Sequence, residues 1–144
     1  MFSLTIQPRF AETDALGHLN NTTLPVWFEQ GRTPIFRIFI PDLDVKNWTL
    51  ILAKIEVEFL REIFYGFDVE LKTYIERIGN SSLVVYQEAW QKGELAATGR
   101  ATMVHFDHQA KKSCPIPDAI RAQLTEHMIN EKKRSSLEYK STSI

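Results

Sequence analysis

The chain has 144 residues, of which 44% are hydrophobic and 24% charged, and its formal net charge is -1 at pH 7. This length and composition are typical of one globular domain. The nearly neutral charge gives no electrostatic reason to expect nucleic acid or an anionic membrane surface as a partner. A single cysteine, Cys114, excludes an intrachain disulfide and the common paired-cysteine zinc patterns, so we expect no metal and no cofactor.

The N-terminal residues lack a basic stretch followed by a long apolar run. Charged residues or prolines interrupt the longest apolar stretches in the rest of the chain. We therefore expect no signal peptide, no membrane span and a cytoplasmic location.

The first elements are a strand and a helix. Residues 2–10 begin with alternating apolar and polar side chains, which predicts a half-buried strand. A helix is expected to start near residues 21–23, because Asn and Thr are good N-caps and Pro25 suits a first turn. Apolar residues then recur at helical spacing, but Pro34 lies among them, so we expect a bend at residues 31–34.

Four strand-like runs follow, and their period of two predicts a largely antiparallel sheet. They lie near residues 51–59, 67–76, 83–90 and 95–107. Small residues in the last run, such as Gly99, suggest that another element packs closely on it. One long helix against a five-stranded sheet gives an α+β fold.

The C-terminal part of the chain divides into a helix and a tail. Residues 118–128 are predicted to form a short helix after two prolines. Residues 131–144 are polar and charged, which predicts a loose tail. We therefore expect one domain at residues 1–130 and a polar tail at residues 131–144.

A turn-rich segment with the pattern Asp-x-x-Gly-His-x-Asn-Asn lies between the first strand and the helix. This segment, together with the helix start, resembles the signature of hotdog thioesterases, the group that includes 4-hydroxybenzoyl-CoA thioesterases and related acyl-CoA thioesterases. The resemblance extends over about residues 3–125. It rests on residues 10–21, 27–32, 57–61, 65–67 and 78–83.

The resemblance implies a single hotdog fold and hydrolysis of acyl-CoA to a free acid and CoA. Asp14 is then the catalytic carboxylate, either as general base for water or as a nucleophile that forms a mixed anhydride. A backbone N–H near Asn21, at the helix N-terminus, would stabilise the oxyanion, and Gly17 would let the loop pass close to the thioester. Without the resemblance, Asp14 would be interpreted as an ordinary turn residue.

Other polar residues of the pattern keep two interpretations. His18 could contact substrate, act as a second acid or base, or simply hold the loop. Asn20 could orient substrate or cap the helix. Ser81 and Ser82 belong either to an ordinary turn or, as the resemblance implies, to a region that approaches the site of a neighbouring subunit.

The resemblance also implies a homodimer, and possible assembly to a homotetramer, because two hotdog subunits join at an exposed sheet edge. Two alternatives to the thioesterase are considered. One is a hotdog dehydratase or hydratase, whose His-Glu or Asp-His arrangements do not match this sequence. The other is a non-catalytic module that binds acyl-CoA or acyl carrier protein.

Overall fold

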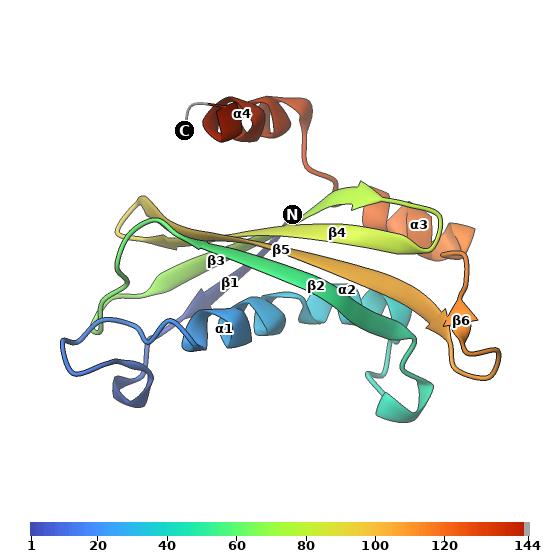
Figure 1. The fold of residues 1–144 in the computed structure, drawn as a ribbon, viewed down its shortest axis with the longest axis horizontal. Coiled ribbons are helices and arrows are strands. Elements are labelled where there is room, and N and C mark those ends of the chain that lie inside the picture. The colour runs from blue at the N-terminus through green and yellow to red at the C-terminus, as the bar shows by residue number, and fades with distance from the viewer. Residues whose placement is uncertain (143–144) are drawn as a thin grey trace.

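The computed structural model describes residues 1–142, in which helices lie on both faces of one antiparallel sheet (Figure 1). The strands are β1 (Phe2–Ile6), β2 (Leu50–Phe59), β3 (Val69–Ile78), β4 (Ser82–Gln91), β5 (Glu94–Asp107) and β6 (Lys112–Ser113). The helices are α1 (Thr23–Gly31), α2 (Thr33–Phe39), α3 (Asp118–Thr125) and α4 (Glu131–Thr142), with short 3-10 turns at Phe10–Glu12 and Val45–Asn47. We call the face that packs on α1 and α2 the inner face, and the opposite face the outer face.

The strands lie in the order β1-β3-β4-β5-β2, and the short β6 pairs with β5. Every pairing between these strands is antiparallel. The predicted α+β hotdog arrangement is therefore confirmed. Strand β1 ends at Ile6 rather than near residue 10, because Pro8 has no N–H to donate to a neighbouring strand.

The expected bend in the helix is confirmed as a break at Arg32, which separates α1 from α2. Pro34 lies at the start of α2, where its missing N–H costs nothing. Two buried side chains of the sheet satisfy carbonyls at the end of α1. Thr73 Oγ1 donates to the Gly31 carbonyl at 3.2 Å, and Gln87 Nε2 donates to the Phe28 carbonyl at 2.8 Å.

The core lies between the inner face and the two helices. Small residues of β5 allow α1 to approach the sheet, as expected from the sequence. A Cβ placed on Gly99 would lie 2.8 Å from two ring carbons of Phe28, so only glycine fits there. The remaining buried apolar side chains close to α1 include Leu24, Trp27, Leu71, Ala89 and Ala97.

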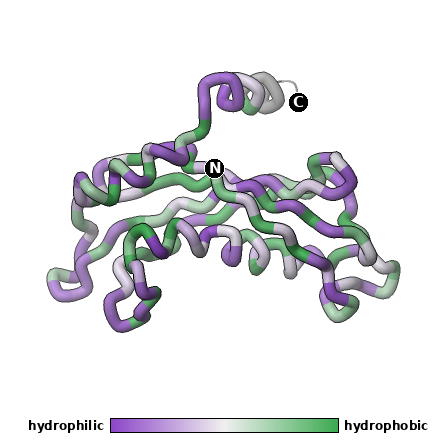
Figure 2. Tube along the Cα trace, turned by 180° about the vertical axis from the view of Figure 1, so that it is seen from behind, coloured by the Kyte–Doolittle hydropathy of each residue, from purple (hydrophilic) through white to green (hydrophobic). Residues whose placement is uncertain are grey.

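The C-terminal residues differ from the expected loose tail, because Glu131–Thr142 form helix α4 on the outer side of the sheet (Figure 1). This helix has no apolar stripe and is mainly hydrophilic (Figure 2), which is why hydrophobic periodicity did not predict it. Residues 143 and 144 of the expected tail lie outside the described residues, and the domain boundary at residue 130 stays a prediction. None of the helices described here is both long and apolar enough to cross a membrane.

Candidate active site

The loop that carries Asp14 is a tight turn closed by its own backbone. Thr13 pairs with Leu19 across it, and the N–H of Asp14 donates to the His18 carbonyl at 2.8 Å. The Asp14 carboxylate is exposed and accepts from Leu16 N–H at 2.8 Å and His18 N–H at 3.1 Å, both at Oδ1. Oδ1 therefore shapes the loop, and no hydrogen bond from a described residue reaches Oδ2.

Gly17 gives the turn its shape. Its φ of +78° lies in the left-handed region that favours glycine, and its carbonyl accepts from Tyr65 N–H at 3.2 Å. A side chain at this position would strain the turn that holds the Asp14 carboxylate. The expected close approach of Gly17 to a thioester stays a prediction.

Glu12 anchors the loop to helix α1. Its Oε2 accepts from the Trp27 indole N–H at 2.9 Å, and its Oε1 accepts from Arg9 N–H at 2.7 Å. Burial alone would raise the pKa of Glu12, but these hydrogen bonds and the Arg9 guanidinium outweigh burial and lower it. Glu12 is therefore a loop-shaping carboxylate.

The Asp14 loop also rests on the segment that precedes β3. His18 pairs with Phe64, and Leu19 N–H donates to the Ile63 carbonyl at 2.7 Å. The buried Gln91 fixes this segment, because it accepts from Phe64 N–H at 2.9 Å and donates to the Phe64 carbonyl at 2.8 Å. Sequence reasoning missed Gln91, since one polar residue at the end of a strand carries no distinct signal.

The N-terminus of α1 lies directly after this loop. Asn20 Oδ1 accepts from the backbone N–H and the hydroxyl of Thr22, at 3.0 and 2.9 Å, so its side chain shapes the entry to the helix. Asn21 is exposed, and its backbone N–H donates to no other described residue. An N–H without a partner beside a helix N-terminus is suited to bind a developing negative charge.

A cavity of about 400 Å³ opens beside this helix start. Its lining includes the polar residues Asn20, Asn21 and Arg61 and the apolar residues Leu24 and Ala97. Asp14 is not among the residues that line it. The remaining lining residues are Leu19, Phe59, Leu60, Glu62 and Ile63.

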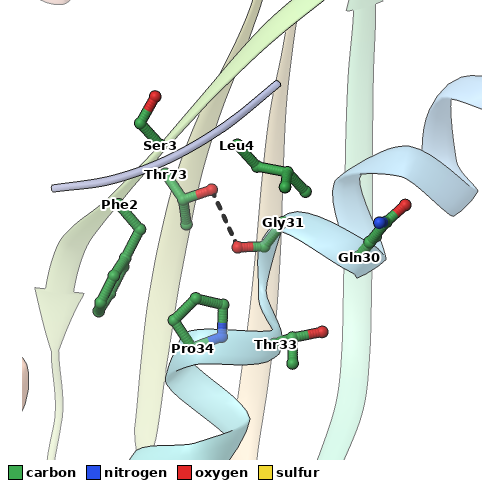
Figure 3. Close-up of a pocket in the computed structure, with 8 residues that line it drawn as sticks. All are labelled: Phe2, Ser3, Leu4, Gln30, Gly31, Thr33, Pro34 and Thr73. Carbon is green, nitrogen blue, oxygen red and sulfur yellow. Dashed lines mark hydrogen bonds between the residues drawn. The ribbon is translucent and has the colours of Figure 1, made fainter. Parts of the chain in front are cut away.

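A second cavity, of about 290 Å³, lies at the break between α1 and α2, next to β1 (Figure 3). Its lining includes Phe2, Leu4 and Pro34, and Thr73 bonds the Gly31 carbonyl beside it. None of the predicted site residues lies here. We therefore assign the candidate active site to the first cavity, which borders the unpaired N–H of Asn21.

Of the remaining predicted site residues, His18 lies close to Asp14, whereas Ser81 and Ser82 lie far from it. His18 lies beside the Asp14 loop, where Nδ1 is 3.6 Å from Glu62 Oε2 and the ring packs edge-on against Phe64 at 5.1 Å. Ser81 and Ser82 form the turn into β4, next to His105 of β5. The cavity is lined by Ala97 of β5, which lies eight positions before His105. This separation corresponds to about 27 Å along the strand. One subunit does not bring these serines to Asp14.

Comparison with known proteins agrees with this fold and places the chain in a family. Residues 8–124 match the model of the Thioesterase-like superfamily. A predicted thioesterase from Bacillus stearothermophilus has a similar structure, with 47% identity, a TM-score of 0.87, and coverage of 90% of this chain and 97% of that one. A thioesterase from Thermus thermophilus, solved with coenzyme A and Zn, is 29% identical, with a TM-score of 0.77 and coverage of 85% and 96%.

A curated relative is also similar to this chain over most of its length. The uncharacterized protein YsmA of Bacillus subtilis (strain 168) is 28% identical over 114 residues, which are 78% of each chain. The family model covers most of the chain, including the Asp14 loop, the cavity and the four long strands of the sheet. The chain therefore belongs to the thioesterase-like superfamily.

Proposed function

We propose that this chain hydrolyses acyl-CoA thioesters to a free acid and CoA, with Asp14 as the catalytic carboxylate. The observation that carries this proposal is the backbone N–H of Asn21, which donates to no described residue and lies on a cavity at the start of α1, directly after the rigid loop that holds Asp14. The coenzyme A in the Thermus thermophilus structure supports CoA as the carrier of the acyl group.

The reaction needs an attacking oxygen and a site for the charge on the carbonyl oxygen. In one route, Asp14 takes a proton from water while the water oxygen attacks the carbonyl carbon. The tetrahedral intermediate then collapses, the C–S bond breaks, and the CoA thiolate leaves and takes up the proton. In the other route, Asp14 attacks directly, CoA leaves, and water hydrolyses the mixed anhydride.

Both routes place negative charge on the former carbonyl oxygen. The Asn21 N–H is oriented by the turn that Asn20 and Thr22 hold, and the dipole of α1 adds partial positive charge at this end. Loss of one such donor typically costs about 10²–10³ in rate. We assign Asn21 to oxyanion stabilisation, Gly17 to the loop conformation, and His18 and Asn20 to the border of the substrate site.

A second copy of the chain would complete this site. Strand β2 is an edge strand, and its exposed apolar residues include Leu52, Ile55 and Phe59. Antiparallel pairing of two β2 edges would set the Phe59 end of one subunit against the Leu50 end of its partner. Since Ser81 lies near the Leu50 end, this pairing supports the proposed homodimer, with Ser81 and Ser82 serving the partner's site.

A thiol-release assay over CoA thioesters from short to long chains tests the proposal. We expect release of CoA from at least one thioester, and loss of release in Asn21→Pro, which removes the proposed donor N–H. Asn21→Ala keeps that N–H and serves as the matched control. If the wild type binds these thioesters, or an acylated carrier protein, without releasing thiol, the chain is instead a non-catalytic binding module.

A further inference from the structure

The outer face of the sheet carries a polar and aromatic cluster far from the Asp14 loop. Alternation along β4 directs Tyr86, Glu88 and Trp90 to this face, and Tyr74 of the neighbouring β3 lies beside Tyr86, with ring centres 6.0 Å apart. Lys133 of α4 reaches into the same place. We call these five residues the outer-face cluster.

Glu88 is the centre of the outer-face cluster. It is only 1% exposed, and burying a carboxylate is costly unless hydrogen bonds and a counter-charge compensate. Its Oε2 accepts from the Tyr86 hydroxyl at 2.9 Å, and its Oε1 accepts from the Trp90 indole N–H at 3.1 Å. Burial and the charge of Glu88 raise the pKa of Tyr86, so the hydroxyl stays protonated and keeps donating.

Lys133 supplies the counter-charge. Its Nζ lies 2.6 Å from Glu88 Oε2, 5.5 Å from the centre of the Tyr74 ring and 6.0 Å from that of Trp90. Among the described residues, no other cation lies within 4 Å of the Glu88 carboxylate. Lys72 lies over Trp90 at 5.0 Å, and Arg100 pairs with Glu76 at 3.0 Å. An ammonium between a buried carboxylate and aromatic rings is the usual arrangement of a cation-binding cage.

The described side chains of α4, those of residues 131–137, make few other contacts with the outer face. The segment before it is fixed, because Ile129 is buried and donates its N–H to the Ile75 carbonyl at 2.8 Å. Within α4, none of residues 131–137 is buried, and the helix is mainly hydrophilic (Figure 2). Arg134 Nη2 donates to the Glu76 carbonyl at 2.6 Å. Among the described side chains of α4, those of residues 131–137, the buried ion pair of Lys133 and the hydrogen bond of Arg134 are the polar contacts with the sheet.

We propose that Glu88, Trp90 and Tyr74 form a binding site for a protonated primary amine, and that Lys133 occupies this site as a tethered ligand which a free amine can displace. The site belongs to the sheet, because Tyr86 and Trp90 hold the carboxylate from β4 itself. Departure of Lys133 leaves the Glu88 carboxylate without its closest cation, because Lys72, opposite Glu88 on β3, lies over the Trp90 ring instead. This favours uptake of another ammonium. Binding of the amine and release of α4 are thus coupled.

Titration of the full-length protein with n-butylammonium, which reproduces the lysine side chain, tests this site. The chain has three tryptophans, so an amide spectrum contains three indole N–H signals, and loss of one in Trp90→Phe identifies Trp90. In Lys133→Ala, we expect the Trp90 signal to shift saturably with amine. The affinity should be at least about tenfold higher than in the wild type, where Lys133 must leave first.

Three controls make the result specific. Lys132→Ala removes an exposed neighbouring lysine and should bind amine like the wild type. Sodium chloride at the same ionic strength should not reproduce the Trp90 shift. Tetramethylammonium has no N–H to donate to Glu88, so it should bind Lys133→Ala at least about tenfold more weakly than n-butylammonium.

Hydrogen exchange then tests the coupling to α4. In the wild type, saturating n-butylammonium should speed amide exchange in residues 131–137 and leave β4 protected. The proposal is overturned if Trp90 in Lys133→Ala responds to n-butylammonium no more than to sodium chloride. It is equally overturned if amine binds the wild type without any change in the exchange of α4.

Discussion

The two carboxylate oxygens of Asp14 have different surroundings. Oδ1 holds the loop through the N–H groups of Leu16 and His18, and Oδ2 accepts from no described residue. One residue can therefore both shape the turn and act as the proposed catalytic carboxylate. The two interpretations of Asp14 from the sequence do not exclude each other. The proposed chemistry depends on the charge of the carboxylate, whereas the loop needs only an acceptor at Oδ1.

Glu12 links loop stability to pH. The pKa of Glu12 is lowered in the folded state, so its stabilising effect is complete above its ordinary pKa of about 4.5 and is lost as the pH falls through the folded-state pKa. We expect Glu12→Gln to reduce the free energy of unfolding by about 1 kcal/mol at pH 7. Urea denaturation should show that this difference shrinks towards pH 3.

The matched control for this prediction is Glu94→Gln, which removes an exposed carboxylate that pairs with Arg61 on the surface. It should change the free energy of unfolding by less than about 0.5 kcal/mol at either pH. A Glu12→Gln effect that is the same at pH 3 as at pH 7 would mean that the carboxylate charge is not what holds the loop.

Residues that act through burial were the least predictable from the sequence. The polar side chains of Thr73, Gln87 and Gln91 lie in strands, where alternation alone would direct polar groups to solvent. They are buried because the break between α1 and α2 and the segment before β3 leave backbone groups that need partners. The Asp14 loop was predictable, because its pattern is local and consists of turn residues.

At the scale of elements, helices and strands with a strong periodicity of apolar residues were predictable from the sequence. Elements without such a periodicity were not. The bend before Pro34 and the four long strands followed from local patterns, with ends that differ by a few residues. Helix α4 was missed because it buries no apolar stripe, and its position depends on Lys133 and Arg134. No local sequence pattern indicates which distant strands pair, as β1 does with β3.

The contact between α1 and β5 makes a prediction at this scale. Gly99→Ala should lower the free energy of unfolding by about 1–3 kcal/mol, because the added methyl group lies 2.8 Å from the buried ring of Phe28. Chemical denaturation checks this value. Thr102→Ala, in the same strand, is the control and should have a clearly smaller effect; equal effects would contradict a tight contact between helix and sheet.

At the scale of the whole molecule, the proposed site depends on pairing of the exposed edge strand β2 with a second chain. Ile55 lies in the middle of edge strand β2 and is 47% exposed. A charge at this position would be buried without a partner if two β2 edges pair. We therefore expect Ile55→Asp to be monomeric by sedimentation, and to lose at least about tenfold of its thioesterase activity.

Val45→Asp is the matched control, because Val45 is 78% exposed and lies outside β2. It should keep the size and activity of the wild type. A wild-type protein that sediments as a fully active monomer would contradict the proposed role of Ser81 and Ser82 in a partner's site. A dimer that persists in Ile55→Asp would place the interface elsewhere on the molecule.

The most direct measurement for the proposed function compares the kcat/KM of the wild type and Asp14→Asn on the acyl-CoA that the wild type hydrolyses fastest. Asparagine keeps an acceptor for Leu16 and His18 N–H, so the loop is preserved while the charge is lost. We expect kcat/KM to fall by about 10²–10⁴, with an unchanged circular dichroism spectrum and unfolding midpoint. Retention of kcat/KM within about tenfold of the wild type would contradict the assignment of Asp14 as the catalytic carboxylate.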